Sequence, residues 1–244
     1  MPLATQQEIR DSYQGRDVAV AYVEQRFTNE LMRLLHDRQV AAVQSVFDDH
    51  RPAAALELAP GPGRVTRDLR PSGRLTCLEF NDGMIAEGMA ACRNGAEWIQ
   101  GDAFQLPFEE QFQFVYSFRF IRHFHRRERD QLYQQIHNVL NTGGRLVVDA
   151  VNERVSGPLR RAKPANYPIY DKLYRSEQEL IDELRDNGFE VVRLEPVQRW
   201  FSLQSRAQVL LGPRSGRLCR WAIRALEHLR SGPALEWIVE CRRA

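Results

Sequence analysis

Short apolar runs alternate with helix-compatible segments over residues 53–151, and this alternation restricts the possible folds more than any other feature. The apolar runs, which we interpret as strands, are residues 53–58, 75–80, 96–100, 112–118 and 146–151. The helix-compatible segments between them are residues 63–70, 82–92 and 126–141. Strands that alternate with helices indicate βαβ units, so we expect a mostly parallel sheet with helices packed against it.

The C-terminal part of the chain extends the same pattern. A further helix is expected after Ser176, because a Ser-x-x-Glu capping box begins there and an Asn-Gly helix end begins at Asn187. Residues 189–197 form a sixth strand in this interpretation, and residues 235–241 alternate apolar and acidic side chains as a last strand would. We therefore predict an α/β, Rossmann-like three-layer sandwich with a mostly parallel seven-stranded sheet and an antiparallel last strand.

Two segments stand apart from the alternating core. Residues 1–50 are typical of helices, and we expect this N-terminal segment to cover the site, with Tyr13 and Tyr22 as candidate contacts. Residues 51–244 are expected to form the main domain. Within it, residues 152–175 interrupt the pattern with prolines and tyrosines, so we expect an irregular insert that serves as a substrate lid, walled by Tyr167, Tyr170 and Tyr174.

Composition excludes several classes of protein. Of the 244 residues 43% are hydrophobic and 27% charged, which supports a sizeable core and excludes a mainly disordered chain. No apolar run approaches the roughly 20 residues that span a bilayer, and the first residues lack the basic start and apolar core of a signal peptide. We therefore expect a cytoplasmic protein without a membrane partner. The four cysteines and six histidines show no zinc-type spacing, so no metal is expected.

Basic residues are concentrated at the C-terminal end. The net charge is only +2, yet residues 199–244 contain nine arginines and three glutamates. This region could face an anionic substrate or a nucleic acid. Only Lys163 and Lys172 among the 34 basic residues are lysines, so the arginines equally fit a compositional preference of the whole chain.

Three acidic residues and a glycine turn mark the ends of successive predicted strands. Glu57 lies in the first strand, just before the turn Ala59-Pro-Gly61-Pro-Gly63. Glu79 ends the second strand and Asp102 follows the third. In a parallel sheet these positions meet at one edge, where such sheets bind nucleosides. The third glycine of a dinucleotide fingerprint is replaced by Thr66, and Glu57 suits a cationic ligand better than a pyrophosphate.

This arrangement resembles the class I S-adenosylmethionine-dependent methyltransferases, of the small-molecule branch that includes ubiquinone-biosynthesis-type enzymes. The resemblance covers most of residues 50–197 and rests on five motifs in order, at residues 57–63, 79–84, 101–108, 112–117 and 140–148. The chain departs from the family pattern in three places. Ala59 replaces the first glycine of the loop, Gln113 replaces an aspartate, and Asn-Val-Leu-Asn-Thr-Gly-Gly replaces Arg-Val-Leu-Lys-Pro-Gly-Gly.

The resemblance implies which residues hold the methionine part of S-adenosylmethionine. Ala59, Gly61 and Gly63 would line this part, with Glu57 nearby. Ser117, after the fourth strand, would reach the sulfonium side.

The resemblance also implies a nucleoside site. Glu79 would hold the ribose hydroxyls, Phe80 and Met84 would pack on the adenine, and Asp102 would accept a hydrogen bond from the adenine amino group. The backbone of Ala103 would contact the ring.

His123 is the candidate catalytic residue. It lies in the loop after the fourth strand, where this fold places its acceptor, and histidine titrates close to physiological pH, as a general base must. Arg119 and Arg122 in the same loop could bind a carboxylate or phosphate on the acceptor. A hydroxyl acceptor needs such a base, whereas a neutral amine needs little more than orientation.

The expected function is methyl transfer from S-adenosylmethionine to oxygen, nitrogen or carbon of a small molecule, either anionic or aromatic. Two alternatives stay open: an RNA or protein methyltransferase that uses the basic C-terminal region, and a non-catalytic member of the fold that binds the cofactor. Nucleic acid is the less favoured partner, because residues 116–119 lack the Asn/Asp-Pro-Pro-aromatic motif of amino-methylating enzymes. A monomer and a homodimer are both compatible with the sequence.

Overall fold

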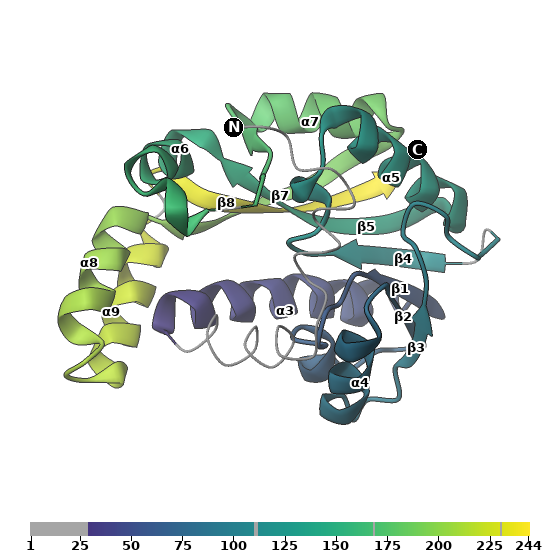
Figure 1. Cartoon of the computed structure of the whole chain (residues 1–244), viewed down its shortest axis with the longest axis horizontal. Helices are drawn as coiled ribbons and strands as arrows, with labels where there is room; N and C mark the ends of the chain where they lie inside the picture. The colour runs from purple at the N-terminus through teal and green to yellow at the C-terminus, as the bar shows by residue number, and fades with distance from the viewer. Residues whose placement is uncertain (1–28, 110–111, 168, 230) are drawn as a thin grey trace.

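A single mixed sheet forms the centre of the molecule. The computed structural model describes residues 29–109, 112–167, 169–229 and 231–244. Its strands run in the order β3-β2-β1-β4-β5-β8-β7, with β6 paired to β5 off this path (Figure 1). The strands are β1 (Ala54–Leu58), β2 (Arg74–Glu79), β3 (Glu97–Gln100), β4 (Phe112–Ser117), β5 (Leu140–Asn152), β6 (Leu173–Tyr174), β7 (Phe189–Arg199) and β8 (Ala234–Arg243).

Strand directions confirm the mostly parallel sheet with an antiparallel last strand. Strands β1 to β5 pair in parallel, and β8 inserts antiparallel between β5 and β7. The sheet has eight strands rather than seven, because β6 adds a short parallel pair with β5 at Val151 and Asn152. A strand of two residues carries no periodicity that the sequence could reveal.

Helices cover both faces of the sheet. In Figure 1 helices α3 and α4 lie below the sheet and α5, α6 and α7 above it, while α8 and α9 form a hairpin at one end. The helices are α3 (Glu30–His50), α4 (Asp82–Ala91), α5 (Arg126–Val139), α6 (Glu153–Ala162), α7 (Glu177–Asp186), α8 (Phe201–Leu211) and α9 (Gly216–His228). The three-layer α/β class expected from the sequence is confirmed.

Helix α3 packs into the core of the sheet. Its buried side chains include Leu35 and Phe47, and the Phe47 ring meets Phe114 of β4 edge-on with centroids 5.4 Å apart. Residues 30–50 thus share a core with the main domain. Tyr13 and Tyr22 lie outside the described residues, so the covering role of residues 1–28 stays a prediction.

Two segments differ from the local expectations. The helix expected over residues 63–70 is only a 3-10 turn, Thr66–Asp68. The insert 152–175 is not irregular throughout, since it contains α6 as well as a 3-10 turn at Pro164–Asn166. Helix α6 begins where the Asn152 side chain accepts a hydrogen bond from the Arg154 amide, and it continues through Pro158. The cap offsets part of the cost of a proline inside a helix.

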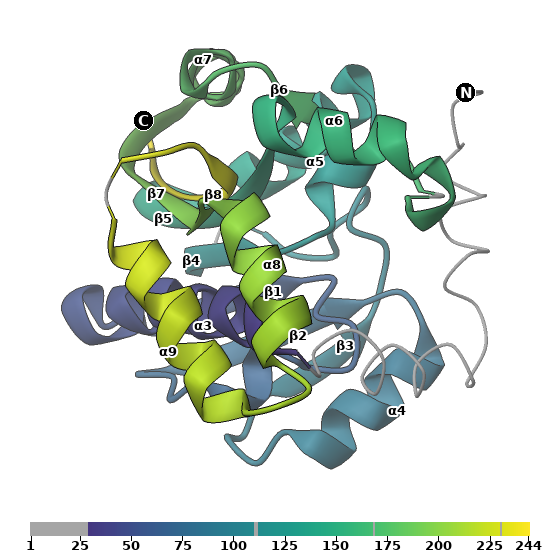
Figure 2. The ribbon, with the colours of Figure 1, turned by 90° about the vertical axis from the view of Figure 1, so that its left-hand side faces the viewer.

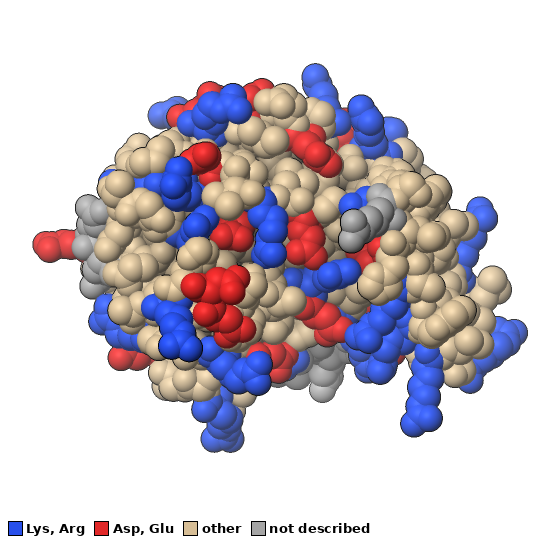
Figure 3. All heavy atoms as spheres, turned by 180° about the vertical axis from the view of Figure 1, so that it is seen from behind, with Lys and Arg blue, Asp and Glu red and all other residues tan. Residues whose placement is uncertain are grey.

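Charges of both signs are interspersed over much of the face seen in Figure 3. Within the described residues, no helix combines the length and the apolar character that crossing a bilayer requires.

Candidate functional site

One cavity lies where β1, β2 and β3 end at the same edge of the sheet. The side chains of Glu57, Glu79 and Asp102 all lie on its wall, although they are far apart in the sequence. Its lining residues are Glu57, Ala59, Pro60, Gly61, Pro62, Arg64, Val65, Leu78, Glu79, Phe80, Asn81, Met84, Gly101, Asp102, Ala103, Phe104, Phe118, Arg119, Phe120, His123 and Phe124. The structure therefore brings the three acidic residues together, as their positions after parallel strands indicate.

The turn after β1 is built from left-handed residues. Ala59, Gly61 and Gly63 have φ of 52°, 58° and 70°. The alanine at the first of these positions costs about 1–2 kcal/mol relative to glycine, because its Cβ crowds the following carbonyl. A Cβ at Gly61 would meet no atom within 4 Å, so the backbone there borders open space.

Gly63 has a different role from the one predicted. A Cβ at this position would lie 2.7 Å from Cys92 Sγ, so glycine is needed to let the turn pack against its neighbours. Gly63 is not among the residues that line the cavity. The prediction that it contacts the methionine part of the cofactor is not supported by this geometry.

Glu79 holds the turn in place. Its Oε2 accepts a hydrogen bond of 3.0 Å from the Gly61 amide, and its Oε1 accepts from the amides of Phe80 and Asn81. Burial raises the pKa of this carboxyl, while the three amide donors act in the opposite direction. A carboxylate offers about four acceptor sites, so a bound ribose has room for one further hydrogen bond unless an amide is displaced.

Glu57 is the most deeply placed acid of the site. The hydroxyls of Thr66 and Tyr116 both donate to its Oε2, at 2.6 and 2.8 Å, and its side chain is 4% exposed. Burial raises the pKa of Glu57 from 4.5 to about 7, even though these hydroxyls lower it. The sequence did not indicate that Thr66 and Tyr116 hold the Glu57 carboxylate. Thr66 drew attention only because it replaces the third glycine of the dinucleotide fingerprint.

The opposite wall of the cavity suits a flat apolar group. Met84 is buried, Phe80 is 44% exposed, and Ala103 and Phe104 follow Asp102. Asp102 Oδ1 accepts from the Phe104 amide at 3.0 Å, which fixes the loop. The five residues predicted for the nucleoside thus lie on one cavity, and their contacts with a nucleoside stay a prediction.

Ser117 does not reach the cavity. Its hydroxyl donates to the Leu58 carbonyl at 2.8 Å, and only 2% of the residue is exposed. It ties β4 to β1 and is absent from the lining residues. The Ser117 side chain is thus directed toward the neighbouring strand, and its predicted contact with the sulfonium side stays a prediction.

A second cavity adjoins the first. Both cavities are lined by Arg119 and His123. The second is walled by Met32, Arg119, Arg122, His123, Val151, Ser156, Arg160, Asn166, Tyr167, Ile169, Asp171, Phe201, Leu235 and Glu236. Met32 belongs to α3 and Phe201 to α8, so segments distant in the sequence close this space.

His123 is held by the insert 152–175. Its Nδ1 lies 3.0 Å from the carbonyl oxygen of Tyr170 and 2.9 Å from Oδ1 of Asp171. Both neighbours are acceptors, so Nδ1 carries a proton. Asp171, 48 positions away, has no motif that would have shown this pairing.

Arg122 is neutralised by buried carboxylates. It forms ion pairs with Asp149 at 3.0 Å, Glu236 at 3.1 Å and Asp171 at 3.2 Å. Burial alone would lower the pKa of Arg122, but the three carboxylates raise it, so the guanidinium stays charged. The backbone amide of Arg119 donates to Asp149 at 2.6 Å. The charge of Arg122 is therefore already paired with carboxylates of the protein, and the expectation that it binds an anionic acceptor is not supported.

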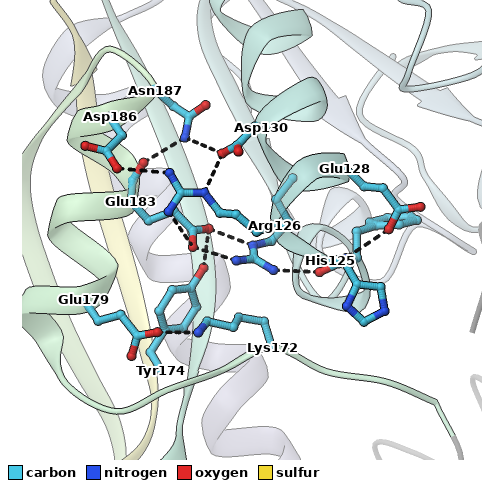
Figure 4. A network of polar contacts seen from close by, with 12 residues as sticks. His125, Arg126, Glu128, Asp130, Lys172, Tyr174, Glu179, Glu183, Asp186 and Asn187 are labelled. Carbon is cyan, nitrogen blue, oxygen red and sulfur yellow. Dashed lines mark hydrogen bonds and ion pairs between the residues drawn. The ribbon is translucent and has the colours of Figure 1, made fainter. Parts of the chain in front are cut away.

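The three tyrosines of the insert occupy three different environments. Tyr167 lines the second cavity, and the Tyr170 ring lies 4.2 Å from the ring of His125, measured between centroids. Tyr174 is buried and donates to Glu183 at 2.8 Å (Figure 4). Only Tyr167 fits the predicted aromatic wall.

Comparisons with known proteins match this geometry. Residues 55–144, from β1 into β5, match the family model described as a methyltransferase domain. The ubiquinone/menaquinone biosynthesis C-methyltransferase of Roseobacter denitrificans is 33% identical over 124 residues. That match covers 47% of each chain, so it spans about half the length of the curated relative.

Solved structures share the fold over nearly the whole chain. Magnesium protoporphyrin IX methyltransferase from Synechocystis PCC 6803 with bound S-adenosylhomocysteine superimposes with a TM-score of 0.65, at 13% identity, over 98% of this chain and 100% of that one. A possible histamine N-methyltransferase from Thermotoga maritima gives 0.63 at 18% identity, over 92% and 96%. The [4+2]-cyclase SpnF gives 0.64 at 19% identity, over 100% and 98%. At these identities the likeness concerns the fold alone.

The strand order, the motifs after β1 to β3 and the matched domain agree with one another. Together they support a class I S-adenosylmethionine-dependent methyltransferase, whose methyltransferase domain is matched over residues 55–144.

Proposed function

We propose that this chain transfers a methyl group from S-adenosylmethionine, held in the first cavity, to a small-molecule acceptor in the second. The observation that carries the proposal is that the two cavities meet at Arg119 and His123. A transfer reaction requires its two reactants to lie side by side, and shared walls provide that arrangement.

The residues of the first cavity fit S-adenosylmethionine. Gly61 leaves open space for a ligand beside the backbone, and Glu57 offers a buried carboxylate for a cationic group. Glu79 retains acceptor capacity for a ribose hydroxyl, and Phe80 and Met84 offer apolar surface for adenine. When bound, S-adenosylmethionine supplies a methyl carbon activated by its sulfonium.

His123 is the group suited to remove a proton from the acceptor. With Nδ1 donating to the Tyr170 carbonyl beside Asp171, the neutral ring keeps its basic nitrogen at Nε2. The Asp171 carboxylate also stabilises the imidazolium that forms when a proton arrives. His123 and Asp171 thus form the proposed base and its orienting partner.

The second cavity favours an acceptor that is largely apolar. Met32, Val151, Ile169, Phe201 and Leu235 contribute apolar surface. The charged groups at its wall are paired with one another, Arg122 with three carboxylates and Arg160 with Asp171. The relative from Roseobacter denitrificans is a ubiquinone/menaquinone biosynthesis C-methyltransferase, so a screen of acceptors for this chain begins with apolar compounds methylated on carbon.

Calorimetric titration with S-adenosylmethionine tests the cofactor half of the proposal. Glu79→Ala and Asp102→Ala should each weaken binding by about 1–3 kcal/mol, the range for removing a partner from a buried hydrogen-bonding group. Glu97→Ala is the matched control, because this exposed acid at the start of β3 does not line the cavity. Unchanged affinity in both site variants would contradict the assignment.

A further inference from the structure

The hairpin of α8 and α9 exposes more apolar surface than any comparable part of the described chain. Of the nine large hydrophobic side chains that are exposed among the described residues, six lie within residues 201–229. They range from 42% to 69% exposed and are Leu203, Val209, Leu210, Leu218, Trp221 and Leu229. Single exposed hydrophobics are ordinary, but a contiguous group indicates an interaction surface.

These side chains face away from the protein. On α9, Cys219, Ile223 and Glu227 recur every four residues and are buried. Leu218 and Trp221 occupy the opposite side of the same helix by their spacing, three residues apart. Figure 2 shows α8 and α9 side by side at the front of the molecule, with their outer faces toward the viewer.

Helix α8 follows the same rule. Gln204 is buried and donates to Glu227 of α9 at 2.7 Å, which joins the two helices on their inner side. Leu203 and Leu210, seven residues apart, lie on the exposed side. The apolar side chains are therefore not needed for packing within the hairpin.

The same surface carries positive charge without acidic neighbours of its own. Its five exposed arginines are Arg206, Arg214, Arg217, Arg220 and Arg224. The only acid within residues 201–229 is Glu227, which is buried and accepts from the amides of Gln198 and Arg199.

Arg220 and Arg224 pair with Glu30 and Asp37 of α3, at the base of the hairpin. In contrast, Arg206, Arg214 and Arg217 form no ion pair with any described residue. In Figure 3 this end of the molecule lies at the right-hand side, where basic side chains project around uncharged surface. Arg126 of α5, by comparison, forms ion pairs with Asp130 and Asp186.

We propose that the α8–α9 hairpin binds the surface of an anionic phospholipid bilayer, with both helices lying in the interface. Leucine, valine and tryptophan beside arginine are the side chains that enter the headgroup region, where tryptophan is enriched and arginine meets lipid phosphate. This is a surface contact, distinct from a membrane-spanning helix and independent of the proposed methyl transfer.

Two other occupants fit the surface less well. RNA would use the arginines and Trp221, but the five exposed leucine and valine side chains offer it neither charge nor a stacking ring. A second copy of the chain in a symmetric dimer would bring two arginine-rich surfaces together, and their like charges would repel. An anionic bilayer satisfies the charge and the apolar area together.

Vesicle binding by the full chain tests the proposal. The chain should sediment with vesicles of phosphatidylcholine and phosphatidylglycerol but not with phosphatidylcholine alone. At roughly fivefold per arginine near an anionic surface, the triple variant Arg206→Gln, Arg214→Gln, Arg217→Gln should bind about 100-fold more weakly. Trp221→Ser combined with Leu210→Ser should also abolish binding.

Tryptophan fluorescence reports the geometry directly. Trp221, 69% exposed, should shift its emission to shorter wavelength on anionic vesicles. Trp221→Phe should remove most of that shift while it retains binding, since the side chain stays apolar and aromatic.

Matched controls separate this surface from general effects of charge and hydrophobicity. Arg175→Gln and Val192→Ser remove an exposed arginine and an exposed apolar side chain elsewhere, and both should bind vesicles as the parent does. Equal binding to neutral and anionic vesicles, or undiminished binding by the triple variant, would overturn the proposal. So would tighter binding to single-stranded RNA than to vesicles, or a dimer that Trp221→Ser dissociates in the absence of vesicle binding.

Discussion

Glu57 illustrates how one buried carboxyl connects stability, pH and ligand binding. Folding moves it out of water, and burial raises its pKa from 4.5 to about 7. The folded chain therefore holds more protons than the unfolded chain between these two pH values. By linkage, the contribution of Glu57 to stability is fully present below pH 4.5 and falls as pH rises toward 7.

The first prediction concerns Glu57→Gln. Glutamine keeps an oxygen for the hydroxyls of Thr66 and Tyr116 but cannot ionise, so the free energy of unfolding should fall less between pH 5 and pH 8 than in the parent. Urea denaturation at both pH values measures the difference. An identical pH dependence in parent and variant would show that Glu57 ionises normally in the folded chain.

The second prediction concerns His123→Ala. If His123 acts as general base, turnover should fall by about 10²–10⁴-fold while affinity for S-adenosylmethionine changes far less. Asp171→Asn should lower turnover as well, because it removes the carboxylate beside Nδ1. Turnover is measured as release of S-adenosylhomocysteine with an acceptor found by screening.

The matched control for that experiment is His125→Ala, since His125 directly precedes α5 and lines neither cavity. A larger loss of cofactor affinity than of turnover in His123→Ala would assign His123 to binding.

At the scale of elements, a buried ion pair joins the segments that carry His123 and Asp171. Arg129 of α5 donates to Glu183 of α7 at 2.7 and 2.6 Å and to the Phe124 carbonyl at 2.8 Å. Tyr174 of β6 donates to the same carboxylate. The pair thus fixes the loop after β4 and the end of the insert 152–175 relative to each other.

The third prediction follows from the burial of that pair. Arg129→Met should cost about 3–5 kcal/mol of unfolding free energy, because it removes the two short hydrogen bonds to the buried Glu183 carboxylate and leaves only Tyr174 and the more distant Arg126 beside it. Arg126→Gln, whose guanidinium is 49% exposed, should cost less than about 1 kcal/mol. Similar losses from both substitutions in urea denaturation would contradict a special role for the buried pair.

The sequence predicted the strands and helices whose side chains follow a regular apolar pattern, and it missed those that have no such pattern. The strands β1, β2, β4 and β5 are buried apolar runs, which the sequence displays directly. Helix α6 contains Gly157 and Pro158 and owes its start to a cap, while α8 exposes apolar residues that a simple amphipathic helix would bury. In both helices tertiary context prevails over local pattern.

The sequence predicts those site residues whose position depends on the strand order. It does not predict those whose role depends on the direction of the side chain. Parallel strands bring Glu57, Glu79 and Asp102 to one edge whatever their rotamers. Ser117 and Gly63 also lie near strand ends. However, the Ser117 hydroxyl donates to the Leu58 carbonyl of β1, and Gly63 packs closely against Cys92. Asp171 reaches His123 only through tertiary folding, which no local motif encodes.

At the scale of the whole molecule, the first cavity is built by segments that follow four neighbouring strands of the sheet. Its lining comes from the turn after β1, the ends of β2 and β3, and the loop after β4. Unfolding any of these segments destroys the site, so a ligand held there binds the folded chain and not the unfolded one. Ligand binding must then stabilise the entire fold.

The last prediction uses this linkage. At a concentration 100 times its dissociation constant, S-adenosylmethionine should add about 2.7 kcal/mol to the free energy of unfolding, which corresponds to roughly 5–10 °C in the melting temperature for a chain of this size. Glu79→Ala should show a smaller shift at the same ligand concentration, because Glu79 both holds the turn and lines the cavity. Glu97→Ala should show the full shift. Calorimetric melting curves with and without ligand measure all three, and a shift that is equal in Glu79→Ala and Glu97→Ala would place the binding site elsewhere on the fold.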